Sequence, residues 1–167
     1  MDTSVLPIII LLPLILGTTL VALLQRFSRE ATALGAIAVS LTCFGLLLTE
    51  AKQIFAGAAI LQSWDWLPQL GLNLSFRLDA LGLLFSLLIT GIGTLIYIYA
   101  YYYLSPRNSL AKLYMLLMVF MTAMLGISLS NNLILLLVFW ELTSISSFLL
   151  VGYWSHYEAA QRGSRMA

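Results

Sequence analysis

One carboxylate lies in the middle of a long apolar segment. Glu141 is eight residues from one end of the stretch 133–153 and twelve from the other, which is roughly 12 and 18 Å along a helix. A carboxylate at that depth in a bilayer costs several kcal/mol unless it faces a cavity, pairs with a cation or keeps its proton. Because desolvation raises a carboxyl pKa and a nearby cation lowers it, such a group can take up and release protons. These properties predict a proton relay at Glu141; the alternative is a protonated packing carboxyl.

Three weaker candidates accompany Glu141. Ser144 lies on the same helical face, although serines in membrane helices also bond their own backbone or a neighbouring helix. Lys112 lies at the inner end of another apolar stretch, and His156 lies just beyond 133–153. Ser144 would act as the local partner of Glu141, whereas Lys112 and His156 would pass protons near an entrance or are simply solvated interfacial residues.

No Lys or Arg shares the interior of an apolar stretch with Glu141 or lies at its depth in another stretch. Every Lys and Arg is at the end of an apolar stretch or in a loop. A relay needs a counter-charge, because the cation sets the proton affinity of the carboxylate. We therefore expect the partner to come from another chain or from a later helix.

Composition excludes several classes of protein. The 167 residues are 61% hydrophobic and 9% charged, with a mean hydropathy of +0.98 and a net charge of +1. This is not a soluble domain, and no basic field exists to recruit nucleic acid. With one cysteine, Cys43, and one histidine, we expect no disulfide framework, metal cluster, cofactor or catalytic triad, and hence no enzyme of its own.

Five stretches are apolar and long enough to cross a bilayer, which takes about 20 helical residues. They are 5–24, 31–49, 80–104, 110–130 and 133–153. Pro13 removes an N–H near the middle of the first stretch, which predicts a bend. We expect an all-α polytopic membrane helix bundle, a single membrane domain over 1–167 in the lipid bilayer of the cell (cytoplasmic) membrane.

The loop between the second and third stretches has strand periodicity. Leucine and phenylalanine alternate with polar residues over 70–79, and Trp64 and Trp66 begin a second short alternation. Pro68-Gln69 supplies a turn, so we expect a short extracytoplasmic β-hairpin at about 61–79. Arg77 and Asp79 are expected to pair there and to serve architecture rather than transport.

Charge and small residues predict the orientation and one contact face. Six basic residues fall on one side of the five stretches and two on the other, so the N-terminus is expected outside and the C-terminus of the segment in the cytoplasm. Gly82, Ser86, Thr90 and Thr94 recur every four residues, as in a face where helices approach closely. Five tyrosines at the inner end of the third stretch are expected to form an interfacial aromatic belt, namely Tyr97, Tyr99, Tyr101, Tyr102 and Tyr103.

Segments 131–133 (NNL) and 139–150 (FWELTSISSFLL) resemble the large A subunit of the Mrp-type multisubunit Na⁺/H⁺ antiporters. Segment 77–82 (RLDALG), the tyrosine run 99–103 and the pair 125–126 are also similar to that family. The large proton-pumping subunits of respiratory complex I and of membrane-bound hydrogenases have a similar layout with a Trp-Glu pair, but typically continue with a glycine-rich sequence. The tract after Glu141 favours the antiporter.

The resemblance implies a secondary transporter in which Glu141 pairs with a lysine on a later helix to move protons. Family members couple that movement to Na⁺ export, so the transported ions would be H⁺ and Na⁺, within a complex of several membrane subunits. The chain would then be the N-terminal portion of a longer subunit. Two alternatives stay open: a proton-pumping subunit of a complex I-like or hydrogenase assembly, and a structural membrane module without transport activity.

Overall fold

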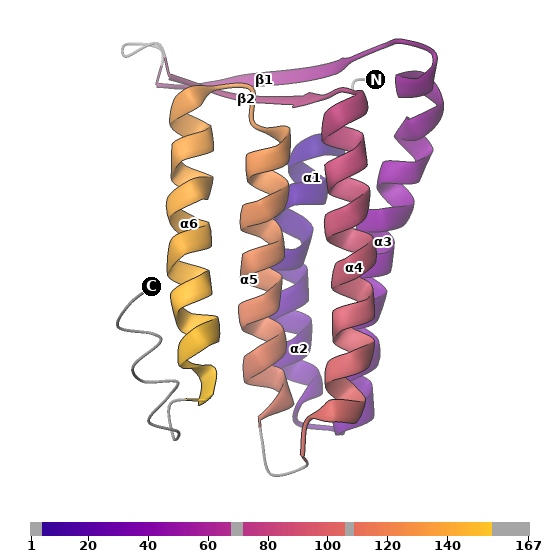
Figure 1. Ribbon diagram of the computed structural model, residues 1–167, viewed down its shortest axis with the longest axis vertical. Helices are drawn as coiled ribbons and strands as arrows, with labels where there is room; N and C mark the ends of the chain where they lie inside the picture. Colours follow the sequence, from indigo (N-terminus) through magenta and orange to yellow (C-terminus); the bar gives the residue numbers. More distant parts are fainter. Residues whose placement is uncertain (1–4, 68–71, 106–108, 155–167) are drawn as a thin grey trace.

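The computed structural model describes residues 5–67, 72–105 and 109–154, and its helices form an upright bundle with a hairpin across one end (Figure 1). Five helical segments are long and apolar enough to cross a membrane, which confirms the predicted membrane helix bundle. The elements are α1 (Val5–Leu12), a π-helical segment (Pro13–Gly17), α2 (Thr18–Leu24), α3 (Arg29–Phe55), β1 (Ile60–Leu67), β2 (Leu72–Leu78), α4 (Ala80–Tyr103), α5 (Leu110–Leu129), α6 (Leu133–Val151) and a 3₁₀ turn (Gly152–Trp154).

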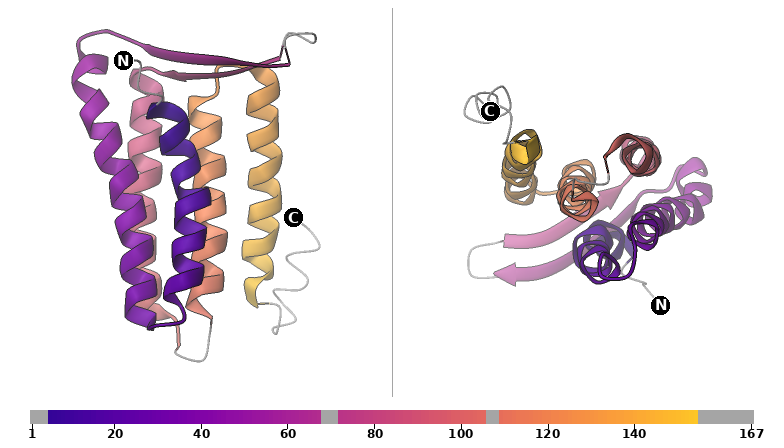
Figure 2. Two further views of the ribbon diagram at one scale, coloured as in Figure 1. Left: turned by 180° about the vertical axis from the view of Figure 1, so that it is seen from behind. Right: turned by 90° about the horizontal axis from the view of Figure 1, so that it is seen from below.

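The helices stand in two rows. Helices α4, α5 and α6 form one row, and the continuous α1–α2 segment stands with α3 in the other (Figure 2). Helix α5 is central, whereas α6 is at the edge and packs mainly on α5, with a smaller contact to β2. Only 11% of the apolar window of α6 is buried, compared with 50% for α5. Most of the α6 surface is therefore uncovered by the described residues.

Pro13 is accommodated by a π-helical segment. Because proline has no N–H, the carbonyl of Ile9 loses its helical donor four residues on. The thiol of buried Cys43 lies 3.7 Å from that carbonyl oxygen and donates to it. The segment Pro13–Gly17 then returns the chain to the α-helical geometry of α2. The cysteine of α3 thus satisfies a backbone group that Pro13 leaves without its partner.

Helix α3 is longer than the predicted stretch 31–49. It starts at Arg29, where the Ser28 hydroxyl accepts the N–H of Ala31 at 3.0 Å. It continues to Phe55 because the residues after Thr49 include good helix formers that need not lie in hydrocarbon. Gly57 ends it at φ 87°, and the bonds Gly57 N to Ile54 O and Ala58 N to Gln53 O form a Schellman motif.

The hairpin is antiparallel and is bonded to the helices beneath it. Its register runs from Ile60 opposite Leu78 to Leu67 opposite Leu72, with an irregularity after Asp65. The backbone N–H of Leu6 donates to the Gln62 side chain at 3.1 Å, which ties the hairpin to α1. The predicted hairpin is confirmed, whereas the proposed turn residues 68 and 69 lie outside the described residues.

The small-residue face of α4 is buried, as predicted. Thr94 donates to the Ser40 hydroxyl of α3 at 2.8 Å, and the hydroxyls of Ser86 and Ser128 of α5 are 3.1 Å apart. The placement of Tyr97 in an interfacial belt is wrong. It is 1% exposed and its ring meets that of Tyr114 edge-on at 5.3 Å, because it faces α5 and not the bilayer surface.

Candidate functional site

The first turn of α6 is held by one asparagine. The Asn132 side-chain oxygen accepts the N–H of Ile134 at 2.8 Å and caps the helix. Its amide nitrogen donates to the carbonyl of Asn73 on β2 at 3.1 Å. The neighbouring Asn131 N–H donates to the Ser75 carbonyl at 2.9 Å. The start of α6 is therefore fixed both to its own helix and to the hairpin.

The rotation of α6 about its axis is set by a close contact with α5. The Phe139 ring packs directly over Gly126, where an added Cβ would overlap the ring. Phe76 of β2 packs against the same ring, with the centroids 6.5 Å apart. Each residue turns a helix by about 100°, so Glu141 points roughly 200° away from Phe139. Consequently Glu141 lies on the exposed side of α6.

Glu141 lies near mid-height of its helix. Eight residues separate it from the start of α6 and ten from the end, or roughly 12 and 15 Å. Large apolar side chains surround it on the exposed face of α6, including Leu137, Val138, Ile145 and Phe148. In an apolar bilayer this is an expensive place for a carboxylate without a cavity, partner or proton. The helix presents the carboxylate to whatever covers this face.

Cations in the described part of the chain lie away from Glu141. Arg26 lies in the turn before α3, Arg29 at the start of α3 and Lys52 in its last turn, while Arg77 is on β2 and Lys112 is in the first turn of α5. No ion pair reaches Glu141 among these residues. No group of three or more His, Cys, Asp or Glu able to hold a metal ion occurs there either.

The weaker candidates do not gather around Glu141. The Ser144 hydroxyl is exposed and lies 3.4 Å from the Trp140 carbonyl of its own helix. Lys112 is exposed at the end of the bundle opposite the hairpin. His156 lies outside the described residues. A proton entrance involving Lys112 or His156 stays a prediction.

Arg77 and Asp79 meet where β2 leads into α4. The Nε atom of Arg77 is 3.5 Å from Asp79 Oδ2, and both side chains are partly exposed. The other oxygen, Oδ1, accepts the N–H of Gly82 at 2.9 Å and caps α4. Asp79 therefore joins the hairpin to α4 through two interactions.

The end of α6 away from the hairpin is tied to α5. The hydroxyl of Tyr153 donates to the carbonyl of Ser109 at 3.0 Å, and Ser109 is the residue that caps α5. Partial burial raises the pKa of Tyr153, and the positive charge of Arg29 opposes this shift. Both ends of α6 are thus bonded to the bundle, while no described residue covers the face that carries Glu141.

Sequence patterns missed the residues that position Glu141. The pair Asn131-Asn132 before an apolar run is typical of a helix start, and that signal was available. The contact between Gly126 and Phe139 has no such sequence signal. It forms because the phenylalanine ring of one helix fits against the other helix where glycine has no side chain. The tertiary structure alone reveals it.

Comparisons with known proteins agree with this architecture. The Na⁺/H⁺ antiporter subunit A1 of Staphylococcus aureus is 41% identical over 162 residues, which is 97% of this chain and 20% of that protein. The chain resembles an antiporter A subunit along almost its whole length. The chain spans about a fifth of the length of the antiporter A1 subunits that it matches. Residues 66–114 match the family described as NADH-ubiquinone oxidoreductase (complex I), chain 5 N-terminus.

Two solved structures share the fold. The Mrp complex from Dietzia sp. DQ12-45-1b matches 87% of this chain and 16% of the solved chain, with a TM-score of 0.69 and 26% identity. The membrane-bound sulfane sulfur reductase, an archaeal respiratory membrane complex, matches 89% of this chain and 23% of its own, with a TM-score of 0.74 and 22% identity. The chain is therefore a multi-pass membrane protein with an Mrp-like membrane fold.

Proposed function

We propose that this chain is part of a multisubunit Na⁺/H⁺ antiporter in which Glu141 relays protons. The observation that carries the proposal is the mid-helix carboxylate on the uncovered face of α6. A carboxylate at mid-span is costly unless a cavity, a cation or a proton accompanies it, and such residues typically mark ion pathways. A lysine on a later helix or in another subunit supplies the counter-charge. The similarity to the antiporter subunit A1 supports the choice of ions.

The charge distribution supports an orientation for the assembly. Among the described cations, Arg26, Arg29 and Lys112 lie at the end away from the hairpin, whereas Lys52 and Arg77 lie at the hairpin end. Positively charged loops tend to remain in the cytoplasm. We therefore place the hairpin on the outer face. The variants Lys52→Cys and Lys112→Cys, treated on intact cells with an impermeant thiol reagent, check this placement. We expect label at position 52 and none at position 112.

The test is Glu141→Gln in the full-length subunit, expressed with its partner subunits. The amide removes the charge and the titration but nearly keeps the shape. We would measure the Na⁺-triggered collapse of a pH gradient in inverted vesicles with a pH-sensitive dye. We expect exchange to be lost in an assembled complex, since proton transfer by a positioned group typically contributes roughly 10²–10⁴-fold.

Two variants control for indirect effects. Glu141→Asp keeps a titrating group and is expected to retain part of the exchange with a shifted pH profile. Glu50→Gln removes a carboxylate near the hairpin end of α3 and is expected to leave exchange unchanged. Unchanged exchange in assembled Glu141→Gln would refute the relay and leave a structural membrane module as the better description.

A second candidate is a proton-pumping subunit of a complex I-like assembly. It is favoured by the match of residues 66–114 to the complex I chain 5 family. The same vesicles separate the two candidates. An antiporter exchanges protons when Na⁺ alone is added, whereas a redox-driven pump moves protons only while an electron donor is oxidised.

A further inference from the structure

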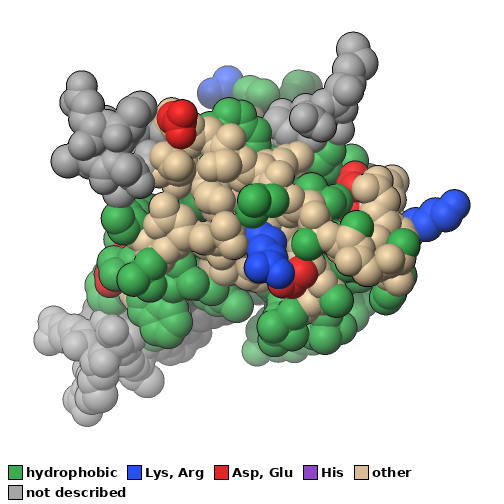
Figure 3. Space-filling model, turned by 90° about the horizontal axis from the view of Figure 1, so that it is seen from above, with side chains coloured by type: hydrophobic (Ala, Val, Ile, Leu, Met, Phe, Trp, Pro, Cys, Tyr) green, Lys and Arg blue, Asp and Glu red, His purple; other side chains and the backbone are tan. Residues whose placement is uncertain are grey.

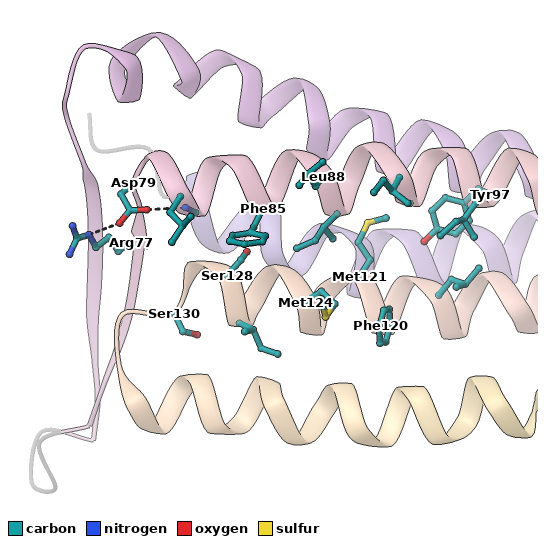
Figure 4. Close-up of a pocket in the computed structure, with 18 residues that line it drawn as sticks. Arg77, Asp79, Phe85, Leu88, Tyr97, Phe120, Met121, Met124, Ser128 and Ser130 are labelled. Carbon is teal, nitrogen blue, oxygen red and sulfur yellow. Dashed lines mark hydrogen bonds and ion pairs between the residues drawn. The ribbon is translucent and has the colours of Figure 1, made fainter. Parts of the chain in front are cut away.

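A groove runs along the row of helices between α4 and α5. It has a volume of about 640 Å³, within the range of roughly 300–1,000 Å³ common for small-molecule sites. Figure 4 shows it extending from Arg77 and Asp79 at the hairpin to Tyr97 further along α4. Large apolar side chains form its two sides, namely Leu81, Phe85, Leu88 and Ile92 from α4 and Phe120 and Met124 from α5.

The glycines of the groove are already used to bring α4 and α5 together. A Cβ at Gly82 would lie 3.3 Å from the carbonyl oxygen of Ser128, and one at Gly93 would meet the Met121 side chain. Close packing of a further membrane helix relies on such small residues. Here the open surface is instead made of bulky side chains.

A cation lies at the mouth of this apolar groove. Asp79 contacts the Nε atom of Arg77 at 3.5 Å, and the Arg77 side chain stays 52% exposed. Within the described residues this is the one ion pair of Arg77, so its terminal nitrogens face outward with two-pronged donor geometry suited to phosphate. Charged side chains are few and scattered on this end of the molecule (Figure 3). A phosphate here would thus be read by one guanidinium and not by a basic patch.

The part of the groove nearest the hairpin has the length of one lipid leaflet. From Leu81 to Ile92 this outer part rises eleven steps along α4, or roughly 16 Å, and the groove continues beyond it to Tyr97. Half of a hydrocarbon core of about 30 Å is about 15 Å. We propose that the groove between α4 and α5 binds a membrane phospholipid, with the phosphate on Arg77 and one acyl chain lying against Phe85, Leu88 and Ile92. This site is separate from Glu141 and independent of the proposed relay.

The experiment uses the full-length subunit assembled with its partners in lipid nanodiscs. The probe is a phosphatidylglycerol that carries a photoactivatable diazirine in one acyl chain, and labelled peptides are mapped by mass spectrometry. We expect labels on the groove residues of α4 and α5. We expect Arg77→Gln to lower them at least fivefold, Arg77→Lys to retain part, and Lys52→Gln, a cation at the same end but outside the groove, to leave them unchanged.

Two further comparisons isolate the phosphate. Asp79→Asn keeps a side chain able to cap α4 and removes a negative charge beside Arg77, so labelling is expected to stay equal or rise. A neutral diacylglycerol with the same diazirine chain is expected to label the groove at least fivefold less. Equal labelling by the neutral lipid, or no effect of Arg77→Gln in an assembled complex, overturns the phosphate site.

Protein cover over the groove would also overturn the proposal. In that case the groove residues stay unlabelled while lipid-facing residues of α3 such as Leu34 and Leu41, which are exposed, are labelled. This outcome would identify another membrane segment as the occupant. It leaves the test of Glu141 unaffected, because exchange activity is measured separately.

Discussion

Replacing Gly126 by alanine tests whether the Phe139 ring fixes α6. The new methyl group overlaps the ring, which must retreat by about 1 Å or more to regain an ordinary carbon–carbon separation of roughly 3.5–4.0 Å. Overpacking of this kind costs about 1–3 kcal/mol. Alanine in a helix is also more favourable than glycine by roughly 0.8–1.0 kcal/mol. This gain partly offsets the steric cost in the measured stability.

A matched variant removes that ambiguity. Gly45 lies in α3, and a Cβ there would meet nothing within 4 Å. Gly45→Ala therefore carries the helix gain without the clash. The difference between the two variants isolates the steric cost, which we expect to be about 1–3 kcal/mol.

The assay is unfolding of the full-length subunit by titration with sodium dodecyl sulfate, followed by tryptophan fluorescence. Gly126→Ala should unfold at lower detergent fraction, and Gly45→Ala at the same or a higher fraction. Adding Phe139→Leu to Gly126→Ala should recover part of the loss, because the smaller side chain makes room for the methyl group. Equal stability of the two alanine variants, or no recovery in the double variant, would refute the idea that this contact holds α6.

The two bonded ends of α6 give further predictions. Asn132→Ala should lower the free energy of unfolding by about 0.5–2 kcal/mol, whereas Asn132→Asp keeps the helix cap and loses only the donor to Asn73; the same detergent titration compares them, and equal losses would contradict a role for the cap. Tyr153→Phe removes a hydrogen bond worth about 0.5–1.5 kcal/mol. Because the pKa of Tyr153 is raised in the fold, its contribution is complete below about pH 10 and is lost as the pH rises through the folded pKa, so titrations at pH 8 and pH 11 should show a shrinking difference.

Local patterns were sufficient for the helices and the hairpin. Runs of about 20 apolar residues have one low-energy arrangement in a bilayer, because a helix satisfies its own backbone hydrogen bonds. The alternation of apolar and polar residues before Asp79 was enough to predict a strand. Boundaries were less well determined: α3 runs to Phe55 instead of residue 49, since polar helix formers and the glycine at 57 decide its end outside the apolar run.

Contacts between helices required the tertiary structure. Tyr97 was expected at the interface and is buried against Tyr114, because the direction of a tyrosine depends on which helix stands beside it. The amino-acid sequence by itself determined that a carboxylate lies at mid-span, since depth follows from counting residues along a helix. The tertiary structure decided where that carboxylate points: Phe139 packs on Gly126, and the helical turn between residues 139 and 141 then directs Glu141 away from the described bundle.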